Sequence, residues 1–136
     1  MTPSLPEEVY VALLKSKTPT PEAFRLRQNE DSLSIAATER KARGTLKCKG
    51  YAVLSVAGIN AIPGLYVQIK RAELQLVPGI IDPDYLEVMG LPLFDFVEAT
   101  IYEYAEALLK TVVRYESFDK PIRLTAGETG EPPNQP

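Results

Sequence analysis

The clearest pattern in the sequence is the stretch LFDFVEATIYEYAEALLKTVVRY, residues 93–115. Apolar side chains recur there at steps of three and four residues, the spacing that places them on one face of an α-helix. That face consists of Phe94, Val97, Ile101, Tyr104, Ala105, Leu108 and Val112. Acidic residues stand near its start and basic residues near its end, as the helix dipole favours. The stretch therefore predicts one long amphipathic helix near the C-terminus.

Several segments before this helix alternate between apolar and polar residues, which is typical of half-buried strands. Ala23–Arg27 and Leu33–Ala37 alternate in this way and predict a hairpin. Tyr51–Val56 is apolar on both faces apart from one serine, which predicts a central strand. Leu65–Leu76 alternates again and fits one long bent strand or a tight hairpin.

Three further segments carry helix signals. Ser4–Lys17 has a capping box and an apolar face, although Val9–Val11 also has strand character. Thr38 is placed to cap a short helix that stops at Gly44, and Asp82-Pro83-Asp84 resembles a helix start with proline at its first position. Short strands followed by one long helix predict an α+β fold. We expect a mainly antiparallel sheet of about four to six short strands, with the long C-terminal helix packed on one face.

The length of 136 residues fits one domain, which we expect over residues 1–124. Residues 125–136 are rich in proline and poor in apolar side chains, so we expect a disordered tail there. The twenty uncharged residues Gly50–Ile69 have the length of a membrane span, but Asn60 and Gln68 and several turn residues dilute them. We therefore expect no membrane association and, without a secretory signal or a second cysteine, a cytoplasmic location.

The sequence contains no histidine and one cysteine, which excludes imidazole chemistry, internal disulfides and cysteine-rich zinc sites. Cys48 lies between two lysines but has no histidine to act as its base. Asp82, Asp84 and Glu87 offer carboxylate oxygens to a divalent cation, yet ordinary helix-start chemistry explains them equally well. We expect neither a metal nor a cofactor, and no catalytic residue stands out.

Charge is divided unevenly along the chain. Residues 1–72 have a net charge of +5 and residues 73–136 a net charge of −8. The candidate binding residues are the cations of the first half: Arg25, Arg27, Arg40, Lys41, Arg43, Lys47 and Lys49. These cations either contact a phosphate-bearing ligand or face the acidic half of the same chain.

A set of short motifs runs from Phe24 to about Tyr115. They are Phe24–Arg27, Glu30–Ser34, Lys49–Val53 and Asp82–Pro92. In their order the sequence resembles a group of small uncharacterised bacterial proteins. The resemblance implies a bacterial, cytoplasmic, stand-alone domain and adds no mechanism. The sequence departs from the group at Tyr85, where the resemblance implies a histidine.

Three functions stay open on these observations. The first is a non-enzymatic interaction or regulatory protein, which binds a protein partner or a second copy of itself as a homodimer. The alternative is nucleic-acid or phosphate-ligand binding through a basic surface, and the third is an enzyme that uses carboxylate, lysine or tyrosine side chains. A large exposed apolar patch favours the first function, and a deep pocket that holds Arg25 and Arg27 favours a small-molecule ligand.

Overall fold

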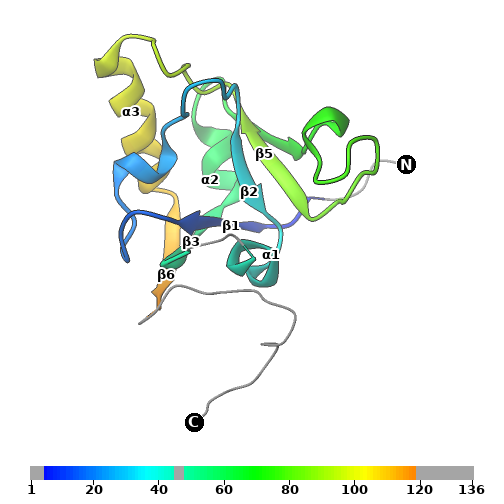
Figure 1. Cartoon of the computed structure of the whole chain (residues 1–136). Coiled ribbons are helices and arrows are strands. Elements are labelled where there is room, and N and C mark those ends of the chain that lie inside the picture. The colour runs from blue at the N-terminus through cyan, green and yellow to red at the C-terminus, as the bar shows by residue number, and fades with distance from the viewer. Residues whose placement is uncertain (1–4, 45–47, 119–136) are drawn as a thin grey trace.

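The computed structural model describes residues 5–44 and 48–118, which form a six-stranded antiparallel sheet (Figure 1). The strands are β1 (Glu8–Leu13), β2 (Leu33–Ala36), β3 (Gly50–Ser55), β4 (Tyr66–Ile69), β5 (Tyr85–Met89) and β6 (Val112–Ser117). The helices are α1 (Glu39–Arg43), α2 (Val56–Ala61) and α3 (Glu98–Leu109), with two 3₁₀ turns, η1 (Pro21–Phe24) and η2 (Ala72–Leu74). The strand order β4-β5-β2-β1-β3-β6 makes β4 and β6 the edges of the sheet.

The sheet consists of two halves that meet at one point. β1 pairs with β3 along its whole length, from Glu8↔Ser55 to Leu13↔Gly50, and β6 extends this half. The other half contains β2, β5 and β4. The register between β1 and β2 comprises the pair Tyr10↔Ala36, and β1 crosses β2 steeply in Figure 1. Beyond that pair the two strands part.

One face of the sheet carries the main hydrophobic core. Alternate residues of the strands enter it, for example Val9 and Val11 from β1 and Leu86 and Val88 from β5, because successive strand residues point to opposite faces. The core is closed by Phe24 of η1 and by buried residues of α2 and α3. The opposite face holds a smaller cluster, in which Ala42 of α1 joins Ala36, Tyr51 and Val53.

The predicted α+β class and antiparallel sheet are confirmed, but the long C-terminal helix is wrong. α3 covers 12 residues, Glu98–Leu109, and the chain then turns into the edge strand β6. The β-branched pair Val112-Val113 favours an extended backbone, and hydrogen bonding to β3 stabilises that conformation. On the other side, Phe94 and Val97 of the predicted apolar face are 52% and 60% exposed.

The N-terminal predictions fail for a related reason. Residues predicted as the helix Ser4–Lys17 instead contain the strand β1, whose alternation of Val9, Val11 and Leu13 is buried by the core. Ala23–Arg27 is not a strand, because Pro21 begins the 3₁₀ turn η1 there. The strand at Leu33–Ala36 is confirmed, but it pairs with β1 and β5 and so forms no hairpin with residues 23–27.

Of the remaining predicted strands and helices, some are confirmed and others are wrong. The strand at Tyr51 and the short helix capped by Thr38 are confirmed, and the Thr38 hydroxyl accepts from the backbone N of Lys41 at 3.2 Å. The alternation from Leu65 continues only to Ile69, after which η2 begins a loop. Asp82-Pro83-Asp84 begins no helix and lies instead in the loop directly before the strand β5, Tyr85–Met89. The tail expected at residues 125–136 lies outside the described residues.

Candidate functional site

Glu87 is a charged residue buried in the sheet. It lies in the middle of β5, its register partners are Ser34 of β2 and Gln68 of β4, and its exposed fraction is 0%. Leu86 and Val88 on either side enter the main core, so the Glu87 side chain points to the opposite face. A buried carboxylate is costly unless hydrogen bonds and an opposite charge compensate it.

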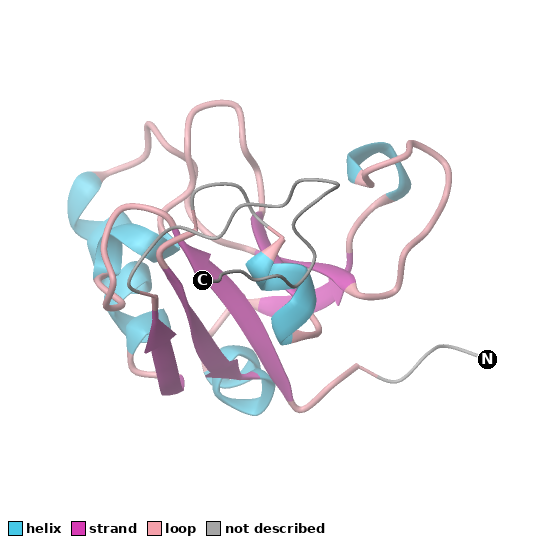
Figure 2. Ribbon diagram, turned by 60° about the horizontal axis from the view of Figure 1, so that its bottom comes forward, coloured by secondary structure: helices cyan, strands magenta, loops and turns pink. Residues whose placement is uncertain are grey.

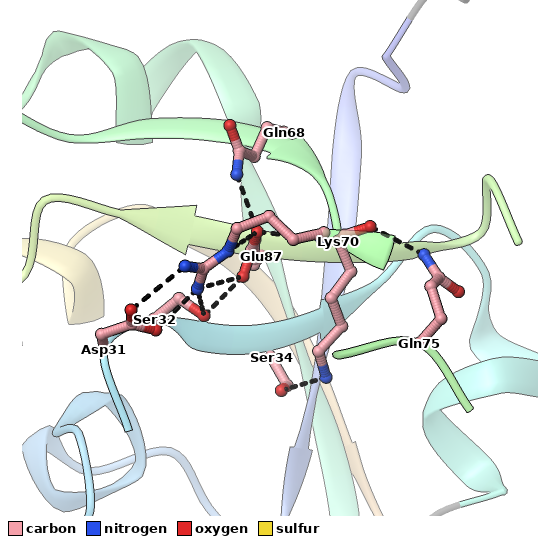
Figure 3. Close-up of polar contacts among 8 residues, drawn as sticks. Asp31, Ser32, Ser34, Gln68, Lys70, Gln75 and Glu87 are labelled. Carbon is pink, nitrogen blue, oxygen red and sulfur yellow. Dashed lines mark hydrogen bonds and ion pairs between the residues drawn. The ribbon is translucent and has the colours of Figure 1, made fainter. Parts of the chain in front are cut away.

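Both carboxylate oxygens of Glu87 have such partners (Figure 3). Oε1 accepts from the Ser32 hydroxyl at 2.6 Å and from Nη2 of Arg71 at 3.2 Å. Oε2 accepts from Nε2 of Gln68 at 2.7 Å, and from Nε and the backbone N of Arg71 at 2.9 Å and 3.2 Å. The same guanidinium also donates to both oxygens of Asp31, at 2.6 Å and 3.1 Å. Arg71 therefore bridges a buried and an exposed carboxylate.

These contacts fix the charge state of the network. Burial raises the pKa of Glu87, but hydrogen bonds from Arg71, Ser32 and Gln68 outweigh it and bring the pKa below its ordinary value. Arg71 likewise lowers the pKa of Asp31. A carboxylate that is ionised and occupied by donors is a poor general base, because no lone pair is directed at a substrate. The network is therefore best understood as a structural clamp.

The clamp holds the start of a long loop between β4 and β5. Arg71 is the second residue of the loop, and the buried side chain of Gln75 links the two ends of the loop. Nε2 of Gln75 donates to the carbonyl of Lys70 at 2.8 Å, and its Oε1 accepts from the backbone N of Asp82 at 3.1 Å. Asp82 also forms an ion pair of 2.6 Å with Lys41 of α1. Contacts from Gln75 and Lys41 therefore hold both ends of the loop against the rest of the fold.

Residues 74–81, LQLVPGII, form the tip of this loop and are called the apolar loop below. They contain no charge, and Figure 2 shows the loop with its 3₁₀ turn projecting from the sheet at the upper right. The large side chains stand in solvent, with exposed fractions of 79% for Leu76, 65% for Ile80 and 52% for Val77. Backbone hydrogen bonds order the tip, including Gly79 N to the carbonyl of Ala72 at 3.2 Å. Ordered, exposed apolar clusters of this kind mark interaction sites.

A second exposed apolar segment precedes α3. Leu93, Phe94, Phe96 and Val97 are each about half exposed, at 49–60%. They lie in the yellow-green connection at the top of Figure 1, away from the apolar loop at the right. Within the described residues, no side-chain clamp equivalent to that of Gln75 holds this segment. The apolar loop is therefore the stronger candidate site.

The structure pairs several of the predicted binding cations with acids. Arg25 donates to both carboxylate oxygens of Glu98 at 2.8 Å and 2.9 Å. Lys41 pairs with Asp82, and Arg43 approaches Glu116 at 3.6 Å. Together with Arg71–Glu87, four ion pairs join a cation of residues 1–72 to an acid of residues 73–136. Part of the positive charge of residues 1–72 is thus paired with acids of residues 73–136 in the same chain.

The remaining predicted cations are Arg27, Arg40, Lys47 and Lys49. Arg27 and Arg40 are exposed and have no ion pair among the residues of the described ranges. Lys49 donates to the carbonyl of Lys15 at 3.3 Å, and Lys47 lies outside the described residues. Arg25 and Arg27 line one cavity, while Arg40, Lys41 and Arg43 belong to α1. Lys15 lines the same cavity as Arg25 and Arg27, so Lys49 lies beside it through the Lys15 carbonyl.

Comparison with protein-family models, with curated proteins and with solved structures finds no match to this chain. Within residues 5–44 and 48–118, no cluster of acidic or cysteine side chains has the arrangement of a metal site. Over the same ranges, no helix has both the length and the apolar content needed to cross a bilayer. Cys48 is buried, and its thiol donates to the carbonyl of Gly50 at 2.8 Å.

Sequence reasoning missed both the clamp and the apolar loop. The Pro78-Gly79 pair in an uncharged run marked a turn, but the alternation of Leu74 and Leu76 suggested a strand instead. The sequence predicted a helix start at Asp82-Pro83-Asp84, whereas the structure has a strand in which alternation places Glu87 away from the core. Its burial depends on Ser32, Gln68 and Arg71, which lie 55, 19 and 16 positions away, so no local pattern showed it.

Proposed function

We propose that this chain is a non-enzymatic interaction protein that associates with a second copy of itself through the apolar loop. The observation that carries the proposal is the uncharged loop tip, in which Leu76 and Ile80 are highly exposed. Two hydrogen bonds of the buried Gln75 side chain hold the base of this loop. Because the loop is already ordered, docking costs little conformational entropy.

Self-association fits the chemistry of the apolar loop. In a two-fold dimer, residues near the axis lie beside their own copies, so a charge there meets a like charge. Residues 74–81 contain no charge and avoid this repulsion. They follow the edge strand β4, and Tyr66 at the start of that strand is 49% exposed. Two β4 edges beside the axis can add backbone hydrogen bonds to the apolar contact.

Sedimentation velocity over a range of protein concentrations tests the proposal. We expect the wild type to form dimers as concentration rises, and Leu76→Asp or Ile80→Asp to remain monomeric because each places a like-charge pair at the axis. Phe94→Asp is the matched control, since Phe94 is 52% exposed in the other apolar segment. A wild type that stays monomeric at high micromolar concentration, or a Phe94→Asp variant that is equally monomeric, would contradict the proposal.

The alternative of nucleic-acid binding has less support. Arg25, Lys41 and Arg43 contact carboxylates of the same chain, so a phosphate backbone would have to displace those partners. Filter binding with short DNA and RNA duplexes separates the two proposals. Affinity that falls steeply with added salt would favour the alternative.

A further inference from the structure

A cavity of about 510 Å³ opens where β1 and β2 part. Its walls include Val11 and Ala12 from β1 and Leu33 and Ser34 from β2, and Phe94 also lines it. Its volume falls in the range of about 300–1,000 Å³ that is usual for small-molecule sites.

The register of the sheet explains why the cavity exists. From the pair Tyr10↔Ala36, continued antiparallel pairing would bring Ala12 opposite Ser34, but that pair is not formed. Both residues line the cavity instead, and both also line a smaller cavity of about 190 Å³ beside Tyr10 and Tyr85. The gap is therefore built into the junction between the two halves of the sheet and does not depend on a loose loop.

The rim of the larger cavity carries charges of both signs. Arg25 is held by Glu98 and Glu22, and the Glu30 carboxylate accepts from the backbone N of Arg27 at 2.7 Å. The side chains of Lys15 and Arg27 make no ion pair with any acid in the described parts of the chain. The rim thus combines an apolar wall with two cations that have no ion-pair partner among the described residues.

We propose that this cavity binds an amphipathic organic monocarboxylate. The carboxylate lies between Arg27 and Lys15, where a guanidinium and an ammonium both donate to it, and the apolar body packs against Val11, Leu33 and Phe94. A single negative charge is favoured because Glu22 and Glu30 line the same cavity and repel a second one. This site is separate from the apolar loop, so it does not depend on the self-association proposed above.

The probes for a test are octanoate, octanamide and octyl phosphate, which share an alkyl chain and differ in head-group charge. The two ionic probes are titrated below their micelle concentrations and octanamide below its solubility limit, at a pH above the second pKa of the phosphate. Binding to the full-length ¹⁵N-labelled protein is followed by amide chemical shifts. We expect saturable shifts with octanoate at residues around Ala12, Arg27 and Ser34, and weaker binding of the neutral and the dianionic probes. Equal binding of all three, tighter binding of octyl phosphate, or shifts confined to the apolar loop would overturn the proposal.

Charge-reversal variants locate the head group. Arg27→Glu is expected to weaken octanoate binding by about tenfold or more, the loss that follows when a charge-assisted hydrogen bond is replaced by repulsion. Arg40→Glu is the matched control, because Arg40 is an exposed cation on α1 outside the cavity. Equal weakening by both variants would show a general charge effect and overturn the site. Should Arg27→Glu lose its dispersed amide spectrum, Arg27→Gln makes the same comparison without charge reversal.

Discussion

Two arginine–glutamate pairs in this protein have similar geometry and different surroundings. Arg71 contacts Glu87 at 2.9 Å, and Arg25 contacts Glu98 at 2.8 Å. The arginine side chains are similarly exposed, at 29% and 22%. The glutamates differ, since the Glu87 side chain is 0% exposed and that of Glu98 is 67% exposed. The two pairs therefore isolate the effect of burying the carboxylate.

Burial changes what happens when the arginine is removed. Water reaches Glu98 and can solvate it, so the Arg25–Glu98 pair adds little to stability. Water does not reach Glu87, so without Arg71 its charge has no adequate compensation. The contact distance alone would rank the pairs as equals. Their contributions to folding are set by how accessible the acid is.

The largest effect expected from this comparison is that of Arg71→Met. The variant leaves the Glu87 carboxylate buried with only Ser32 and Gln68 as side-chain donors. We expect it to lower the free energy of unfolding at neutral pH by about 3–5 kcal/mol, the usual cost of breaking a buried ion pair. Urea unfolding followed by circular dichroism measures it.

A double variant shows whether the stability lost in Arg71→Met comes from the buried Glu87 carboxylate that is left without its arginine. Arg71→Met combined with Glu87→Leu removes both charges, and we expect it to recover much of the lost stability because no buried charge remains. If the double variant is as unstable as Arg71→Met alone, the loss comes from packing around Arg71 rather than from the uncompensated Glu87 carboxylate.

The pH dependence of stability should change sign between the wild type and Arg71→Met. In the wild type the pKa of folded Glu87 is below its ordinary value of 4.5, so its stabilising contribution is present above that value and is lost as pH falls through the folded pKa. In Arg71→Met burial remains while the strongest donor is gone, so we expect the pKa of Glu87 to lie above its ordinary value. Stability then decreases as pH rises from the ordinary pKa toward the raised one, by about 1.4 kcal/mol for each pH unit that separates the two.

Unfolding free energies measured in urea from about pH 3 to pH 8 test this change of sign, because the wild-type contribution of Glu87 is lost only below its ordinary pKa of 4.5. Comparing Arg71→Met with Glu87→Gln in the Arg71→Met background isolates Glu87, because the glutamine does not titrate. A free energy that rises with pH in both the wild type and Arg71→Met would show that the hydrogen bonds from Ser32 and Gln68 suffice to keep Glu87 ionised.

The fold was predictable where local and tertiary preferences agree. Tyr51–Ser55 has apolar residues on both faces and is an interior strand, and Thr38 caps the helix that its spacing predicts. The helix predicted at 93–115 was too long, because the periodicity of its apolar residues continues into Val112. In the structure Val112 pairs with Leu54 of β3 instead. Period alone cannot distinguish a helix end from the start of an edge strand when both positions are apolar.

The candidate site was less predictable than the fold. Its clamp joins Gln68 of β4 and Glu87 of β5 to Ser32, which directly precedes β2, and to Arg71 of the loop after β4. The sequence contains no signal that brings Arg71 to Glu87 before the strand order is known. The charge division did carry information, because Arg25, Lys41, Arg43 and Arg71 all contact acids of the second half. The charge division indicated that the two halves of the sequence attract each other. It did not indicate that the Arg71–Glu87 pair is the one with a buried acid.

The smallest effect concerns the exposed pair. Arg25→Met should lower the free energy of unfolding by about 0–1 kcal/mol, since Glu98 regains water when the guanidinium leaves. The effect should also shrink with added salt, which screens an exposed pair more than a buried one. Unfolding in urea with and without added sodium chloride measures both variants, Arg25→Met and Arg71→Met. A loss for Arg25→Met as large as that for Arg71→Met would mean that the exposure of Glu98 does not weaken its pair, and the distinction between the two sites would fail.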